Sequence, residues 1–227
     1  MSNDQAGKAE QGMEKYFFRA SAADFKSMPT APIAYWFSEN AFTAFARARS
    51  LEETAQARRG LSTGDNESFV RFWYEISNEL SSFGSAPTIE RWFPYQKGGD
   101  YRKWFGNNDL VVNWEGDGKN IKSQPPKPSG DRGWRTTSEE SYLKSGITWT
   151  GLSSGSVSFR QSKSGFLFDT NKGPMMFPDK ADYSKVLGFL NSRPTAYFLA
   201  ALNPTMSTQN EDIDNLPFCP EWFPDFR

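Results

Sequence analysis

The stretch Arg91–Trp114 alternates aromatic rings with cations and amides around the glycine pair Gly98–Gly99. Glycine accepts backbone conformations that a side chain blocks, so the pair predicts a sharp turn ahead of a strand at Leu110–Trp114. An aromatic-rich hairpin with solvated lysines is the simpler interpretation of such a stretch. Flat rings, fork-shaped donors and amides are also the groups that contact a phosphate backbone and base edges. Three cations stand within one loop's reach of each other here: Lys97, Arg102 and Lys103.

Histidine is absent from all 227 residues. Its absence rules out Ser-His-Asp and Cys-His catalysis and every metal site with a histidine ligand. The single cysteine, Cys219, rules out cysteine-rich zinc sites as well. No glycine-rich phosphate loop of the Gly-x-Gly-x-x-Gly or Gly-x-x-x-x-Gly-Lys-Ser/Thr type is present. We therefore expect no cofactor or metal site in this chain.

The formal net charge is -1, so any nucleic-acid binding would need positive charge gathered on one face. Mean hydropathy is -0.68 and no apolar run approaches the ~20 residues of a membrane span, so we expect no membrane contact. One cysteine excludes an internal disulfide and fits a reducing compartment. Residues 1–12 are polar and lack the apolar core of a signal peptide. We expect a cytoplasmic protein.

Short elements are expected along the first half of the chain. A helix should begin after Ser38 and carry Phe42 and Phe45 on one face. Ser68–Ile76 carries rings on both sides, which predicts a strand covered on both faces. Two further elements are expected, a strand at Tyr16–Arg19 and a short helix that the capping box Ser50–Glu53 opens and that runs to about Arg58.

The second half is expected to be β-rich before its hydrophobic period changes to a helical one. Helices are predicted over Tyr183–Leu190 and from Pro194 onward. Strands are predicted near 146–150, 157–160 and 166–169. The whole pattern predicts one α/β domain over residues 16–218, with residues 1–15 as a flexible N-terminal segment, 119–138 as an inserted surface loop and 219–227 as a C-terminal tail.

Two polar segments outside the central stretch are candidate contact sites. Between Gly60 and Asn66 a hydroxyl-rich turn can offer backbone N–H and hydroxyl groups to a phosphate, although an ordinary connection between elements has the same composition. The loop Ile121–Arg135 is rich in proline, glycine and cations, and it is equally consistent with a functional loop and with a solvated linker.

The chain resembles a known family along most of its length. Residues 60–66, 92–107 and 111–115 are similar to PglX proteins, the adenine-specific DNA methyltransferases of BREX phage-defence systems. Residues 147–149, 153–155, 159–160, 165–169, 187–192 and 202–205 continue the likeness in the same order. The segment Leu187–Pro217 also resembles, more weakly, the target recognition domains of type I restriction specificity subunits. The S-adenosylmethionine loop and the Asn-Pro-Pro-Tyr/Phe motif of PglX enzymes do not occur here, so the resemblance concerns their target recognition region.

The resemblance implies a target-recognition-type α/β domain: a mixed twisted β-sheet with flanking short helices and long loops. It implies double-stranded DNA as a partner, together with a methyltransferase domain or other defence-system proteins. S-adenosylmethionine would belong to the parent enzyme. The candidate DNA-binding residues are Ser62, Thr63, Asn66, Tyr95, Gln96, Lys97, Arg102, Lys103, Asn107, Asn108, Arg132, Arg135, Ser153 and Ser154, and no residue is expected to be catalytic.

Two other classes of function remain open from the sequence. The many rings also suit a protein-interaction module that docks on a methyltransferase or another defence component without touching DNA. An independent enzyme is the third alternative, and the missing histidine, cofactor loop and carboxylate pair all argue against it.

Overall fold

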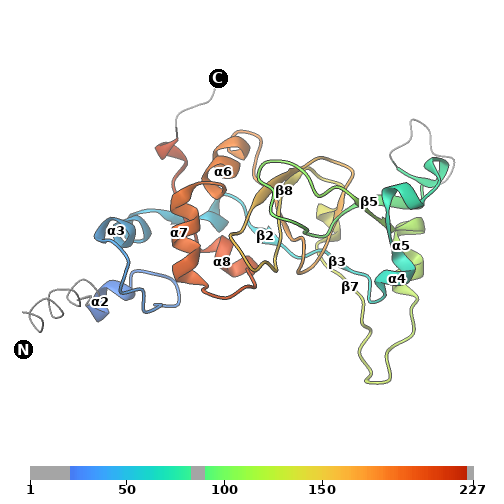
Figure 1. The fold of residues 1–227 in the computed structure, drawn as a ribbon, viewed down its shortest axis with the longest axis horizontal. Coiled ribbons are helices and arrows are strands. Elements are labelled where there is room, and N and C mark those ends of the chain that lie inside the picture. The colour runs from blue at the N-terminus through green and yellow to red at the C-terminus, as the bar shows by residue number, and fades with distance from the viewer. Residues whose placement is uncertain (1–20, 83–89, 224–227) are drawn as a thin grey trace, which may run out of the picture. The chain divides into compact units, whose positions relative to one another are not determined.

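The computed structural model describes residues 21–82 and 90–223. Contacts within the chain divide it into two compact units, residues 1–48 and 49–227. Figure 1 shows the elements of both units along the chain. The expected flexible segment 1–15 and the expected strand Tyr16–Arg19 lie outside the described residues.

The described part of the first unit, residues 21–48, contains two helices. Helix α2 (Ala22–Phe25) is capped by Ser21, and α3 (Glu39–Arg47) begins after Ser38, whose Oγ accepts a hydrogen bond from the Ala41 N–H. This N-cap satisfies a backbone donor that the helix itself leaves unpaired, and it confirms the helix predicted from the sequence.

The second unit contains a mixed four-stranded sheet with the strand order β10-β5-β6-β4. Strands β4 and β5 flank β6 in antiparallel pairings, and β10 adds to β5 in parallel. The bounds of the four strands are Val70–Phe72 (β4), Trp92–Gln96 (β5), Leu110–Asn113 (β6) and Leu167–Phe168 (β10). The mixed sheet confirms the expected fold class, and β6 confirms the expected strand after the glycine turn.

A second four-stranded sheet, with the order β2-β11-β8-β9, is antiparallel throughout. Its strands are Ala57–Arg58 (β2), Met175–Met176 (β11), Gly146–Trp149 (β8) and Phe159–Ser162 (β9). Two antiparallel pairs complete the strands, β1 (Arg49–Ser50) with β12 (Pro217–Phe218) and β3 (Leu61–Ser62) with β7 (Arg135–Thr136).

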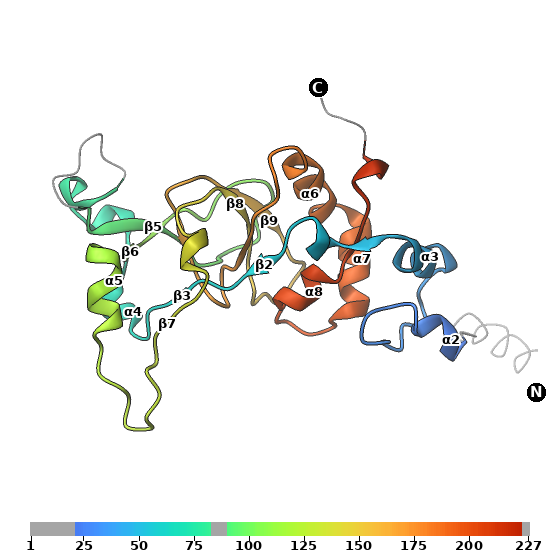
Figure 2. The same cartoon turned by 180° about the vertical axis from the view of Figure 1, so that it is seen from behind.

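The helices of the second unit are short and gather at its two ends (Figure 2). Helices α6 (Tyr183–Leu190), α7 (Arg193–Leu202) and α8 (Asn210–Asp214) lie at one end. At the other end lie α4 (Asn66–Phe69) and α5 (Glu115–Lys122). Single 3-10 turns fall at Leu51–Glu53, Trp73–Glu75, Asn78–Leu80, Glu139–Ser141 and Pro220–Trp222.

The hydrophobic core under the first sheet draws on residues far apart in the sequence. Tyr95, Val112 and Leu167 come from three neighbouring strands and are fully buried. Leu61 from β3 and Ile121 from α5 close the same cluster. This cluster holds the end of β5, where the candidate residues begin, in a fixed position.

Three expectations about local structure are wrong. The strand predicted at Ser68–Ile76 is only β4, because a helical turn precedes it and a 3-10 turn follows, and the rings of Trp73 and Tyr74 are exposed. The helix expected from Ser50 to about Arg58 is a single 3-10 turn over Leu51–Glu53, and the Ser50 side chain makes no capping hydrogen bond. Helix α5 occupies the start of the loop expected at 119–138.

Candidate functional site

The ends of β5 and β10 meet at a largely buried cluster of polar side chains, Tyr95, Lys97 and Asp169, which we call the polar node. The Tyr95 hydroxyl lies 2.8 Å from the Leu61 carbonyl oxygen and 2.9 Å from Asp169 Oδ2, so its single hydrogen serves these two acceptors. Lys97 Nζ donates to the same Asp169 oxygen at 2.9 Å. The other carboxylate oxygen accepts the backbone N–H groups of Asn171 and Lys172. The node joins the two strands where their loops begin.

The pKa values at this node follow from burial and charge. Burial alone would raise the pKa of Asp169, but the Lys97 ammonium and the backbone N–H groups hold that pKa below its usual value. Burial and the neighbouring carboxylate raise the pKa of Tyr95 well above its usual value. Tyr95 is therefore a neutral donor, and Lys97 and Asp169 form an ion pair.

The amide of Gln96 is also buried. Its Nε2 donates to Asn108 Oδ1 at 3.0 Å and to Ser162 Oγ at 3.2 Å, while Oε1 has no hydrogen-bond partner among the described residues. Tyr95, Gln96 and most of Lys97 are thus inside the protein. In this structure they support the loop that follows them.

That loop, residues 98–108, is pinned to the open edge of β9. The Trp104 N–H donates to the Phe159 carbonyl at 2.9 Å, and the Trp104 carbonyl accepts the Gln161 N–H at 2.8 Å. Trp104 has a φ of 75°, a conformation that non-glycine residues seldom adopt, and its ring remains 53% exposed. Tyr101 and Phe105 are exposed to a similar extent. A fixed backbone therefore presents three rings to solvent.

Cations surround these rings. Arg102 and Lys163 are exposed, and Lys163 Nζ lies 5.7 Å from the centre of the Phe105 ring. Arg160 is fully buried beneath the loop and has no acidic partner among the described residues. Burial, with Arg102 nearby, lowers the pKa of Arg160 to about 10, so it stays charged at neutral pH. This part of the surface is positive although the chain's net charge is not.

The hydroxyl-rich turn is tied to the polar node. Asn66 Oδ1 accepts hydrogen bonds from Lys97 Nζ and from Thr63 Oγ1, at 2.9 and 2.8 Å. Thr63 is buried, Ser62 is half-buried in β3, and Asn66 is exposed. The turn and the loop after β5 are therefore brought together, although their hydroxyl and amide groups mostly bind each other.

The remaining candidates are scattered over several surfaces. Ser153 and Ser154 lie beside Tyr101 on a shallow depression, and Asn107 donates to the Asp100 carbonyl. Arg132 is exposed with its guanidinium 5.6 Å from the Trp134 ring centre, and Arg135 faces solvent from β7. In Figure 1 the loop that carries Arg132 lies apart from the loop after β5.

Several residues of this surface were not predicted from the sequence. The ring residues Tyr101, Trp104 and Phe105 and the cation Lys163 were not among the candidates. Their alternation with Arg102 and Lys103 was visible as a pattern, but only the structure shows that the rings point outward. Asp169, the acceptor for Lys97, is 72 residues away in sequence and left no local signal.

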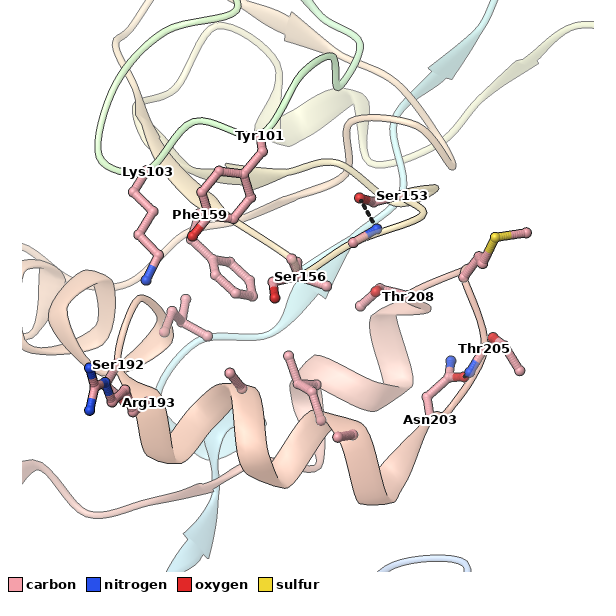
Figure 3. Close-up of a pocket in the computed structure, with 17 residues that line it drawn as sticks. Tyr101, Lys103, Ser153, Ser156, Phe159, Ser192, Arg193, Asn203, Thr205 and Thr208 are labelled. Atoms are coloured by element: carbon pink, nitrogen blue, oxygen red, sulfur yellow. Dashed lines mark hydrogen bonds between the residues drawn. The ribbon is translucent and has the colours of Figure 1, made fainter.

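A pocket of about 330 Å³ opens beside this loop, between α7 and the segment 153–157 (Figure 3). Lys103 and Arg193 lie at one end of it, and Asn203 and Thr205 lie at the other. Phe159 and Leu199 form part of its apolar wall, and no acidic side chain lines it. Among the residues that the structure describes, no group of three or more acidic or cysteine side chains is arranged to hold a metal ion, and no helix is long and apolar enough to cross a membrane.

A domain with several small mixed and antiparallel sheets and short helices belongs to the α/β class. The sequence matches no family model. It is 36% identical over 214 residues to the adenine-specific methyltransferase PglX of Lacticaseibacillus casei, covering 92% of this chain and 18% of that protein. It is 31% identical over 198 residues to the adenine-specific methyltransferase BrxX of Escherichia coli, covering 86% of this chain and 15% of that protein.

The chain is thus homologous to one region of PglX-type adenine-specific methyltransferases, which confirms the resemblance predicted from its motifs. It spans less than a fifth of the length of either of these relatives.

Proposed function

We propose that this chain is a DNA-sequence-recognition region that holds duplex DNA for a separate adenine-methylating domain, in the setting of phage defence or restriction and modification. The observation that supports the proposal is the loop after β5, whose fixed backbone presents Tyr101, Trp104 and Phe105 together with Arg102 on a chain homologous to adenine-specific methyltransferases. The exposed cations would contact phosphates, and the rings would pack against sugars or bases.

Burial divides the candidate residues into those that can contact DNA and those that support the loop. Arg102, Lys103 and Lys163 are assigned to phosphates or guanine edges, with Ser153, Ser154 and Asn107 beside them. Tyr95, Gln96 and Asn108 are assigned to holding the loop, because they bond inside the protein or to each other. Ser62, Thr63 and Asn66 support Lys97 from the neighbouring turn. Arg132 and Arg135 would reach DNA as a second, outlying contact.

Methyl transfer itself is assigned to the partner domain, which would bind S-adenosylmethionine. The pocket beside α7 supports this assignment, because it has two cationic residues and no carboxylate to meet the sulfonium cation of S-adenosylmethionine. The methyltransferase domain and other defence proteins are the partners we propose for the chain in the cytoplasm.

The test is selection from a random duplex library. The chain is incubated with the library at ~50 mM salt, where phosphate contacts are strong, and the retained duplexes are sequenced. We expect a short enriched motif, and we expect no methylation of any duplex by the isolated chain with labelled S-adenosylmethionine. Retention without a motif would leave only non-specific binding, and methylation by the isolated chain would overturn the assignment of catalysis to a partner.

A protein-interaction module is the second candidate, and one specific observation favours it. Phe72, Trp73 and Tyr74 are 43%, 54% and 64% exposed, and the rings of Phe72 and Tyr74 stack with centres 5.3 Å apart. The two PglX-type relatives are more than five times as long as this chain, and their additional domains could cover rings at this position. The test is binding of this chain to the rest of such a longer protein. An affinity that does not change with salt, together with no affinity for DNA, would favour the interaction module over the DNA-recognition region.

A further inference from the structure

The pocket beside α7 combines one cationic end with an apolar, ring-lined body. The Lys103 ammonium donates to the Asn191 carbonyl at 2.7 Å, so its side chain is held at the pocket rim. Arg193 stands in the first turn of α7 and has no ion-pair partner among the described residues. Figure 3 shows both side chains at the same end of the pocket.

The charge at this end is not neutralised by the protein. The first turn of α7 contains no acidic residue, and none lines the pocket. A cation in the first turn of a helix is disfavoured, because the helix N-terminus itself carries partial positive charge. Arg193 therefore adds to a positive potential that an anion would relieve, and the pocket lining points to a negatively charged ligand.

The rest of the pocket suits a flat, partly polar group. The exposed ring of Tyr101 lines it, and the buried side chains of Phe159 and Leu199 form its floor. The hydroxyl groups of Ser156 and Thr208 face the space in Figure 3, and neither makes a hydrogen bond to the described residues. Rings supply a stacking surface and free hydroxyls can bond to the edges of a heterocycle. A volume of about 330 Å³ lies in the range of small-ligand pockets.

We propose that this pocket binds a single nucleotide, with its phosphate at Lys103 and Arg193 and its base against the exposed ring of Tyr101. A bare phosphate would use only the cationic end and leave the Tyr101 ring in water. The inference deepens the proposed function and rests on it in one respect: when the ligand is DNA, the bound unit is a nucleotide turned out of the duplex next to the loop after β5.

Isothermal titration calorimetry of the full chain with three probes tests this proposal. The probes are 2′-deoxyadenosine 5′-monophosphate, 2′-deoxyadenosine and inorganic phosphate. We expect the nucleotide to bind at least ten-fold more tightly than either of its parts. Equal affinity for nucleotide and inorganic phosphate would overturn the proposal, and so would the absence of heat with the nucleotide.

Two variants and a control locate the binding. Arg193→Ala should weaken nucleotide binding about ten-fold, and Ala196→Phe, at an exposed position of α7 that lines the pocket, should abolish it. Lys144→Ala removes an exposed cation that does not line the pocket and should leave binding unchanged. Circular dichroism confirms that each variant is folded. Undiminished nucleotide binding by both folded pocket variants would overturn the proposal.

Duplex DNA distinguishes failure of this inference from failure of the proposed function. Duplex binding without nucleotide binding would overturn the pocket assignment and leave the recognition function intact. Nucleotide binding that Ala196→Phe abolishes, without duplex binding, would support the pocket and count against the recognition function.

Discussion

Lys97 Nζ lies 2.9 Å from Asp169 Oδ2, and their side chains are only 12% and 8% exposed. The pair joins the end of β5 to the residue after β10, and so fixes the start of the loop that carries Trp104. A cation that looks like a ligand contact in the sequence is therefore a structural anchor in this fold.

Lys97→Met should destabilise the protein by about 3 kcal/mol, because it leaves the Asp169 carboxylate buried without its cation. Urea unfolding followed by tryptophan fluorescence measures the change. Arg49→Met is the matched control, since the Arg49–Glu53 pair is 80% and 54% exposed and should contribute less than about 1 kcal/mol. Equal effects of the two substitutions would contradict the anchoring role of Lys97.

Gly98→Ala should also destabilise the fold, by more than about 1 kcal/mol, because φ is 76° and a Cβ would lie 2.3 Å from the Lys172 carbonyl oxygen. Gly155→Ala provides the comparison, since nothing lies within 4 Å of the Cβ it would add. Thermal unfolding of both variants measures the difference. A loop that tolerated both changes alike would not be held at Gly98 as described.

Stability should depend on the ionisation of Asp214. Burial raises the pKa of this carboxyl to about 6 from 3.8, although the Ala57 N–H donates to it at 2.7 Å. A carboxyl whose pKa is raised by folding binds its proton more tightly in the native state, so its contribution is full below pH 3.8 and is lost as pH rises through about 6. Asp214→Asn should therefore raise stability at pH 7.5 by about 1 kcal/mol and change it little at pH 4.

Unfolding midpoints in urea at several pH values between 4 and 8 measure this effect. The difference between the variant and the wild type should grow across the interval around pH 6. A constant difference across the series would mean that Asp214 does not titrate there. Asp169 has the opposite sign, because its lowered pKa gives a contribution that is lost only as the solution becomes more acidic than pH 3.8.

Trp104→Ala should weaken DNA binding by about 1–3 kcal/mol if its ring stacks on nucleotides, without changing the salt dependence. Trp73→Ala is the matched control, because its ring is exposed to the same degree but belongs to the separate cluster around Tyr74. Fluorescence polarisation with a labelled duplex compares the two. A larger loss from Trp73→Ala would move the DNA contact to the other cluster.

Much of the local structure was predictable because it depends on neighbours in sequence. Ser38 caps α3, the helical spacing over Tyr183–Leu190 gives α6, and Pro194 stands in the first turn of α7. The segment Ser68–Ile76 misled because its alternating rings favour a strand, whereas only Val70–Phe72 is a strand and the exposed rings of Trp73 and Tyr74 lie in a 3-10 turn. At 116–118 three consecutive residues have positive φ, so the regular helix is interrupted there within α5.

The candidate site was predictable only in part. Its glycines, cations and rings were visible as a pattern, but the separation of inward from outward side chains was not. Tyr95, Gln96 and Lys97 point to partners that lie far along the chain, among them Asp169 and Ser162. The pinning of Trp104 on β9 depends in the same way on a strand 55 residues further on. Long-range hydrogen bonds of this kind decide which face of a loop meets a ligand.

A salt titration of duplex binding tests the central claim most directly. Fluorescence polarisation with a mixed-sequence duplex between ~50 and ~200 mM salt gives the slope of log affinity against log salt. We predict a steep fall for the wild-type chain, and a slope smaller by about 2 for Arg102→Ala combined with Lys163→Ala, because each phosphate contact contributes about 1. No binding at ~50 mM salt, or a slope unchanged by the two substitutions, would contradict the proposal that the loop after β5 faces DNA.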